Sequence, residues 1–102
     1  MAENDIIRTT PDVCSCVNAE ENSLHLEVAL PGVKKENISL KMNKDSFNIV
    51  AKRDEHMEYA TSMTLSCPVD AAHADSVYED GLLKIDAPFK DSMEDALDVP
   101  IH

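Results

Sequence analysis

The chain has 102 residues, of which 9 are basic and 20 acidic, so its formal net charge is −11 at pH 7. This length suits one compact domain, and the 43 % share of apolar residues is enough to build a core. A charge this negative repels nucleic acid and anionic membranes, because both are bound through basic groups, so neither is an expected partner. With two Phe, two Tyr and no Trp, the core is expected to be aliphatic.

Sequence length and patterning also argue against export. No apolar run exceeds three residues, so we expect neither a membrane span nor a signal-peptide core. Three cysteines is an odd number, and without an export signal they indicate reduced thiols in the cytoplasm. The expected location is therefore cytoplasmic.

Alternation of apolar and polar residues is the dominant pattern, and it predicts strands with one buried face. It is clearest where Leu24, Leu26 and Val28 alternate with polar or small residues. The predicted strands, in chain order, are 13–17, 23–30, 38–42, 46–52, 58–66, 74–79 and 82–87. About seven short strands separated by turns predict an all-β fold, an immunoglobulin-like antiparallel β-sandwich.

Turn signals separate these strands. Pro31-Gly32 ends the strand at 23–30, and residues 33–37 are long enough for only one helical turn. Asn43-Lys44-Asp45 predicts a hairpin between 38–42 and 46–52. Asp80-Gly81 is a strong hairpin signal, because glycine accepts a positive φ without a Cβ clash.

The two ends lie outside the strand pattern. Residues 1–10 are polar and patternless, which predicts a short flexible N-terminal arm before a domain at 11–90. Residues 91–102 form an acidic C-terminal extension that ends in Val99-Pro100-Ile101. In an extended segment Val99 and Ile101 project to the same side, which suits adjacent pockets along a sheet groove. The alternative is a tail that ends in apolar residues by chance.

Nothing in the sequence indicates catalysis, a metal site or a cofactor. The chain has only two glycines, Gly32 and Gly81, which excludes a glycine-rich phosphate loop. The carboxylates fall on polar strand positions or in the tail, as expected of a solvated acidic face. Cys14 and Cys16 would lie about 6.5–7 Å apart on one side of a strand, at the outer limit for a disulfide. We interpret the cysteines as small buried hydrophobes and the histidines as surface imidazoles.

Several motifs in the correct order resemble the small heat-shock proteins, the α-crystallin family. Residues 30–38 (Leu-Pro-Gly-Val-Lys-Lys-Glu-Asn-Ile) resemble the turn after that family's second core strand, and residues 81–88 are similar to its Gly-x-Leu-x-Val/Ile-x-x-Pro signature. Val69-Asp70 and Tyr78-Glu79-Asp80 fall between them at the expected offsets, and Val99-Pro100-Ile101 is a variant of the C-terminal anchor. The residues that carry the structural motifs are Leu30, Pro31, Gly32, Gly81, Leu82, Leu83, Ile85 and Pro88.

The resemblance implies an ATP-independent holdase chaperone that binds partly unfolded proteins and suppresses their aggregation. It also implies self-association, in which the Val99-Pro100-Ile101 anchor of one subunit docks between two strands of a neighbour. Carried over by position, the anchor and client groove would be lined by Ile38, Leu40 and Met42 on one side and by Ser76, Val77 and Tyr78 on the other.

One departure from the family concerns the dimer. Many members carry a long loop whose strand swaps onto the partner subunit, whereas here the corresponding connection is only Asp54 to Met57. A connection this short argues against a strand-swapped dimer.

The alternative function is a β-sandwich interaction module, or a co-chaperone that docks on a larger chaperone machine. An aggregation assay without nucleotide distinguishes this alternative from the holdase.

Overall fold

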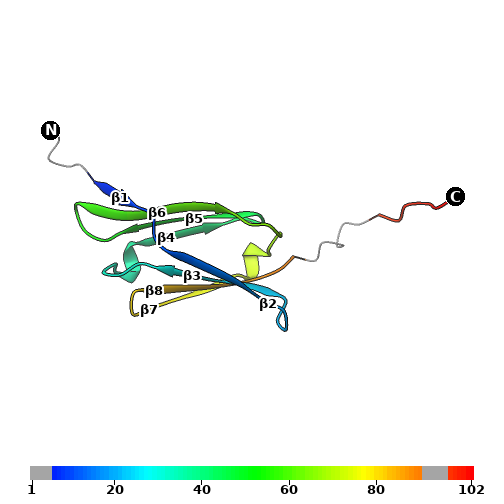
Figure 1. Ribbon diagram of the computed structural model, residues 1–102, viewed down its shortest axis with the longest axis horizontal. Coiled ribbons are helices and arrows are strands. Elements are labelled where there is room, and N and C mark those ends of the chain that lie inside the picture. Colours follow the sequence, from blue (N-terminus) through cyan, green and yellow to red (C-terminus); the bar gives the residue numbers. More distant parts are fainter. Residues whose placement is uncertain (1–5, 91–96) are drawn as a thin grey trace.

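The computed structural model describes residues 6–90 and 97–102 and shows two four-stranded sheets stacked face to face (Figure 1). One sheet has the strand order β1-β6-β5-β4 and the other the order β2-β3-β8-β7. The strands are β1 (Ile7–Thr9), β2 (Val13–Asn18), β3 (Ser23–Ala29), β4 (Ile38–Met42), β5 (Ser46–Lys52), β6 (Met57–Thr64), β7 (Asp75–Glu79) and β8 (Leu82–Pro88). The predicted all-β sandwich is confirmed, and each of the seven predicted strands is present within a few residues of its expected bounds.

The additional strand, β1, lies where the sequence predicted a flexible arm. Residues 7–9 pair in parallel with residues 57–59 of β6, and the Ile7 N–H donates to the His56 carbonyl at 2.8 Å. The side chains add a contact, since Arg8 Nε donates to Glu58 Oε1 at 2.6 Å. The arm prediction therefore does not hold over residues 7–9. Its first five residues, and residues 91–96 of the predicted extension, lie outside the part that the structure describes.

Aliphatic side chains from both sheets fill the space between them, with only Phe47 and Tyr59 as aromatic members. They come mainly from the central strands β3, β5 and β8, because a central strand is covered on both edges and buries one face completely. The buried residues are Leu24, Leu26, Val28, Leu30, Val33, Phe47, Ile49, Ala51, Tyr59, Val69, Leu83, Ile85 and Ala87.

Two of the predicted turns lie against each other at one end of the sandwich. Asp80 and Gly81 both have positive φ, +52° and +78°, as a two-residue hairpin of this type requires. The Leu30 N–H donates to the Gly81 carbonyl at 2.7 Å, and a Cβ on Gly81 would lie 3.2 Å from the Pro31 Cα. The Pro31-Gly32 turn and the β7–β8 turn therefore pack directly against each other.

The remaining connections are short. The hairpin between β4 and β5 is fixed by Asn43 Oδ1, which accepts from the backbone N–H of Asp45 at 3.0 Å and of Ser46 at 2.9 Å. Residues 53–56 connect β5 to β6, as short a link as the sequence predicted. Two 3-10 turns, η1 (Lys35–Asn37) and η2 (Ala71–His73), complete the fold. Within residues 6–90 and 97–102 no helix is long and apolar enough to cross a membrane.

Candidate functional site

The sandwich is open along the side where β4 ends one sheet and β7 ends the other. Two neighbouring hollows lie there, with volumes of about 210 and 340 Å³. Leu40 and Ser76 line both hollows, so the two form one continuous trough, named here the β4–β7 groove. Its lining residues are Lys35, Ile38, Leu40, Met42, Ala71, Ala74, Asp75, Ser76, Tyr78, Leu83 and Ile85.

The structure brings together five of the six residues that the sequence placed in this groove. Ile38, Leu40 and Met42 are half-buried on the inner side of β4, and Ser76 and Tyr78 face them from β7. None of the three β4 side chains is sealed beneath the chain's own backbone, so the groove is accessible.

Val77 is the exception, and its predicted place in the groove is corrected. Successive side chains of a strand point to opposite faces, so Val77 points away from its neighbours Ser76 and Tyr78. It pairs with Lys84 in the β7–β8 register and is 50 % exposed on the outer face of the sheet.

Sequence reasoning missed six lining residues. Leu83 and Ile85 are buried in the core and form the floor of the groove, and Lys35 lies at its wall. Asp75 borders the hollow, but it pairs with Asp86 in the β7–β8 register, so its side chain alternates to the outer face as that of Val77 does. Ala71 and Ala74 close it beside η2. The period-two pattern of residues 74–78 was a usable signal, because it directs Ala74, Ser76 and Tyr78 to one face and excludes Val77.

A hydrogen-bonded tyrosine fixes one wall of the groove. The Tyr78 hydroxyl lies 2.8 Å from the Leu30 carbonyl oxygen and 2.7 Å from that of Val33. These contacts tie β7 to the connection that crosses from β3, in the same sheet as β7, to β4 in the other sheet, and so hold the spacing of the two sheets at this edge. The β7 wall of the groove is therefore held in place by hydrogen bonds.

The predicted structural-motif residues build the scaffold around the groove. Leu30, Leu83 and Ile85 are buried, and Leu82 and Pro88 are half-buried along β8. Pro31 and Gly32 form the exposed turn that packs on Gly81, and Gly32 has a φ of +81°. Of these residues, only Leu83 and Ile85 reach the groove itself.

The predicted anchor is exposed and does not line the β4–β7 groove of its own chain. Val99 is 80 % and Ile101 96 % exposed, in a segment without regular secondary structure at the C-terminal end (Figure 1). Both aliphatic side chains are thus free to dock elsewhere.

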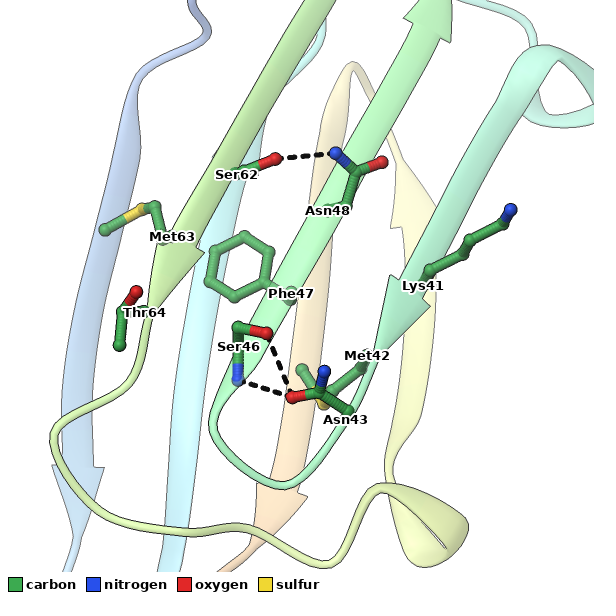
Figure 2. Close-up of a pocket in the computed structure, with 9 residues that line it drawn as sticks. All are labelled: Lys41, Met42, Asn43, Ser46, Phe47, Asn48, Ser62, Met63 and Thr64. Carbon is green, nitrogen blue, oxygen red and sulfur yellow. Dashed lines mark hydrogen bonds between the residues drawn. The ribbon is translucent and has the colours of Figure 1, made fainter.

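A larger hollow of about 430 Å³ lies beside the β4–β5 hairpin (Figure 2). Its polar side chains are largely bonded to one another: Asn48 Nδ2 donates to Ser62 Oγ at 2.6 Å, and Ser46 Oγ donates to Asn43 Oδ1 at 2.9 Å. Lys41 is its one titratable lining residue. The hollow therefore offers no pair of groups for acid–base chemistry, despite its size.

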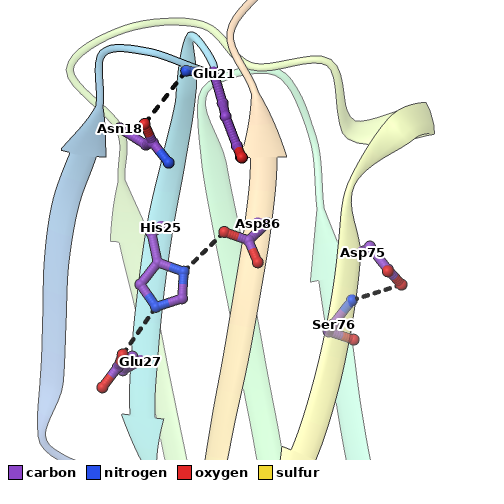
Figure 3. A network of polar contacts seen from close by, with 7 residues as sticks. All are labelled: Asn18, Glu21, His25, Glu27, Asp75, Ser76 and Asp86. Carbon is purple, nitrogen blue, oxygen red and sulfur yellow. Dashed lines mark hydrogen bonds and ion pairs between the residues drawn. The ribbon is translucent and has the colours of Figure 1, made fainter.

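A polar cluster on the outer face of the other sheet centres on His25 (Figure 3). Its Nδ1 lies 2.8 Å from Asp86 Oδ1, and its Nε2 lies 2.8 Å from Glu27 Oε2. The hydrogen bonds to Asp86 and then to Glu27 raise the pKa of His25. Because both ring nitrogens are held by carboxylates, neither is free to act as a base.

The cysteines differ from expectation, because Cys14, Cys16 and Cys67 are all exposed free thiols and not buried hydrophobes. The β2–β3 register puts the first two opposite Glu27 and His25, on the outer face of the sheet, where no described element packs. In the part of the chain that is described, no three His, Cys, Asp or Glu side chains are arranged to hold a metal ion.

Comparisons with known proteins agree with this architecture. Heat shock protein 16.0 from Schizosaccharomyces pombe has a similar structure, with a TM-score of 0.72 at 17 % identity over 93 % of this chain and 77 % of that one. A small heat-shock protein from Xylella fastidiosa gives a TM-score of 0.70 at 19 % identity, over 92 % of this chain and 94 % of that one. At these identities the likeness establishes the fold.

Sequence comparison identifies the family. Small heat shock protein C4 from Rickettsia felis is 31 % identical over 90 residues, which cover 74 % of this chain and 55 % of that protein, so the chain spans about half the length of this relative. The sequence model of the Hsp20/alpha crystallin family matches residues 17–102. Members of this family are ATP-independent chaperones and not enzymes. The chain belongs to the Hsp20/alpha crystallin family of small heat-shock proteins, as its motifs predicted.

Proposed function

We propose that the chain is an ATP-independent holdase that binds partly unfolded proteins through the β4–β7 groove and prevents their aggregation. The observation that carries the proposal is the open groove itself, walled by Ile38, Leu40 and Met42 and floored by Leu83 and Ile85. A trough with an apolar floor and an apolar β4 wall, between two strand edges, accepts an extended segment through its alternate side chains, with little demand on sequence. This suits clients that share exposed apolar segments and little else.

The same groove takes the anchor of a neighbouring subunit. In an extended anchor, Val99 and Ile101 are about 6.5–7 Å apart on one side, and Pro100 points away. The two hollows adjoin at Leu40 and Ser76, so each can receive one of these side chains. In support, the related Xylella fastidiosa protein has a distinct high order structure.

Energetics make this docking reversible. Burial of both side chains contributes about 3–6 kcal/mol gross. The loss of rigid-body freedom and the ordering of the tail offset most of it, which leaves a dissociation constant on the order of millimolar. One anchor is then easily displaced by a client, whereas several anchors within one assembly hold together through avidity. The net charge of −11 keeps a loaded complex soluble.

The test compares Ser76→Arg with Val77→Arg. Both positions are exposed on β7 and both variants change the charge equally, but only residue 76 lines the groove. A model client is heated without nucleotide and its light scattering is followed. Wild type and Val77→Arg should suppress scattering at stoichiometric amounts, and Ser76→Arg should not.

Two results contradict the proposal at different points. Unchanged client aggregation in the presence of wild type would refute the holdase and favour the interaction module or co-chaperone. Suppression by Ser76→Arg equal to that by Val77→Arg would leave a holdase that binds clients elsewhere than the β4–β7 groove.

A further inference from the structure

Strand β2 presents an open edge without the usual protection. It is one of the two outermost strands of its sheet, and among residues 6–90 and 97–102 it pairs only with β3. The other outermost strands in the described part of the chain each carry charge, on Arg8 of β1, Lys41 of β4, and Asp75 and Glu79 of β7. Residues 13–18 (Val-Cys-Ser-Cys-Val-Asn) contain no charge, no proline and no glycine. An uncharged, unpaired edge is a template for another strand.

The hydrogen-bond phase of β2 determines which backbone groups face that open edge. The Ala29 N–H donates to the Asp12 carbonyl at 3.0 Å, so residue 12 bonds towards β3. Along an antiparallel pair the direction alternates, so the N–H and C=O groups of Cys14 and Cys16 also face β3. Those of Val13, Ser15 and Val17 face the open edge.

The sequence of this edge is palindromic. Residues 13–17 read Val-Cys-Ser-Cys-Val in either direction, and Ser15 is the centre. We propose that β2 pairs antiparallel with β2 of a second copy of this chain, about a two-fold axis at Ser15. Each residue type then meets its own kind, as an isologous interface allows, and Asp12 lies opposite Asn18 so that no two like charges are directly paired.

Side-chain positions agree with this register. Val17 is 63 % exposed at the inner side of the sandwich edge, where it and Ser15 border a hollow of about 190 Å³. In the pair, Val13 of the second copy lies against Val17 and covers it. The continuous eight-stranded sheet also satisfies the backbone groups that β2 leaves open.

The thiols provide a chemical readout of the register. Cys14 lies opposite Cys16 of the second copy at a non-hydrogen-bonded position, where Cα atoms are about 4.5 Å apart and a disulfide fits. All four thiols lie on the outer face, because Cys14 is in register with Glu27 and Cys16 with His25. A small-molecule disulfide such as oxidised glutathione locks the pair by thiol–disulfide exchange. Each inter-chain disulfide consumes two chain thiols and one glutathione disulfide and releases two glutathione thiols.

The experiment uses the full chain with Cys67→Ser throughout. Cys14→Ser and Cys16→Ser variants are treated with oxidised glutathione singly and as an equimolar mixture, and non-reducing electrophoresis detects the covalent dimer. In either variant alone, the remaining thiol faces a serine and should not cross-link. In the mixture, Cys16 of one variant faces Cys14 of the other, and a dimer should form.

Other outcomes overturn the proposal. Cross-linking of a single variant as strong as that of the mixture would show a different register or random collision. If the mixture gives no covalent dimer and only glutathione adducts of single chains, the strands do not pair in this register.

A second measurement needs no disulfide and is independent of the anchor. In a Val99→Ala/Ile101→Ala background under reducing conditions, Ser15→Pro removes an N–H that faces the open edge but no bond to β3. Light scattering after size exclusion should report a dimer for Ser15→Ala and a monomer for Ser15→Pro. An equal mass for the two variants would overturn the pairing, whatever the result of the client assay.

Because each chain carries a net charge of −11, added salt should raise the dimer fraction of the Ser15→Ala variant by screening repulsion. A dimer fraction that falls with salt would contradict an uncharged interface between acidic molecules.

Discussion

Replacing Val99 and Ile101 by alanine tests the anchor most directly. The two substitutions remove two and three carbon atoms, which at about 0.8 kcal/mol for each buried CH₂ weakens one docked anchor by about 4 kcal/mol. At about 1.4 kcal/mol per factor of ten, the dissociation constant of a single anchor rises by about three orders of magnitude. Within their own chain the side chains are 80 % and 96 % exposed, so the free energy of unfolding should change by less than about 0.5 kcal/mol.

The assay is the native mass by light scattering after size exclusion, with urea unfolding as the measure of stability. Ser76→Arg places a long side chain in the groove and so disrupts the same contact on the groove side. It should lower the native mass as the double alanine variant does. Combining the two should lower it no further, because a contact already lost cannot be lost again. His102→Ala, next to the anchor on the opposite side of an extended chain, is the control.

Three results would refute this reasoning. An unchanged mass for the double alanine variant would mean that the anchor holds no subunits together. Additive losses from the tail and groove variants would mean that the anchor docks elsewhere than at Ser76. Loss of stability together with mass would mean that the tail packs on its own domain.

Three further changes probe the scaffold. Tyr78→Phe removes a hydroxyl that contacts two backbone carbonyls. Its loss should lower the free energy of unfolding by about 1–2 kcal/mol, and the melting temperature by roughly 4–8 °C for each kcal/mol. An unchanged melting curve would contradict the role of Tyr78 in fixing the groove wall. Gly81→Val puts a β-branched residue at a φ of +78° and a Cβ 3.2 Å from the Pro31 Cα. The variant should therefore be less stable than wild type by more than about 1 kcal/mol. An equal midpoint in urea unfolding would show that the turn tolerates valine. The hydrogen bonds to Asp86 and Glu27 raise the pKa of His25 in the fold, so its protonated ring stabilises the fold below the unfolded pKa of about 6.5, and this contribution is lost as the pH rises through the higher folded pKa. His25→Gln should therefore flatten the fall in stability as the pH rises above about 6.5, and an identical profile would refute the contribution.

Local patterns predicted the strands because the forces that set them are local. Alternating apolar residues, as at Leu24, Leu26 and Val28, define a buried face without reference to the rest of the chain, and a turn such as Asp80-Gly81 encodes its own backbone angles. Strand β1 has no such signature: it has three residues, two of them exposed, and pairs in parallel with a strand about 50 positions away. Its position depends on a free edge of β6, which exists only after the sheet has formed.

The groove was only partly predictable for the same reason. Ile38, Leu40 and Met42 follow from the alternation of β4, but Leu83 and Ile85 carry the same pattern as any core residue. They become a groove floor only because β4 and β7 end their sheets on the same side and leave a gap above them. Exposure of Cys14 and Cys16 likewise depends on β2 being an edge strand.

The β2 edge and the β4–β7 groove have different consequences for assembly. β2 and β7 are the opposite edges of one sheet, so pairing at β2 leaves the β4–β7 groove open. A two-fold β2 pair closes on itself and stops at two copies, whereas an anchor in a neighbour's groove joins unlike surfaces and can continue from dimer to dimer. The native mass should therefore fall in two steps. Loss of the anchor alone should leave a dimer, and loss of the anchor together with Ser15→Pro should leave a monomer. Direct passage from assembly to monomer on loss of the anchor would show that only the groove joins subunits.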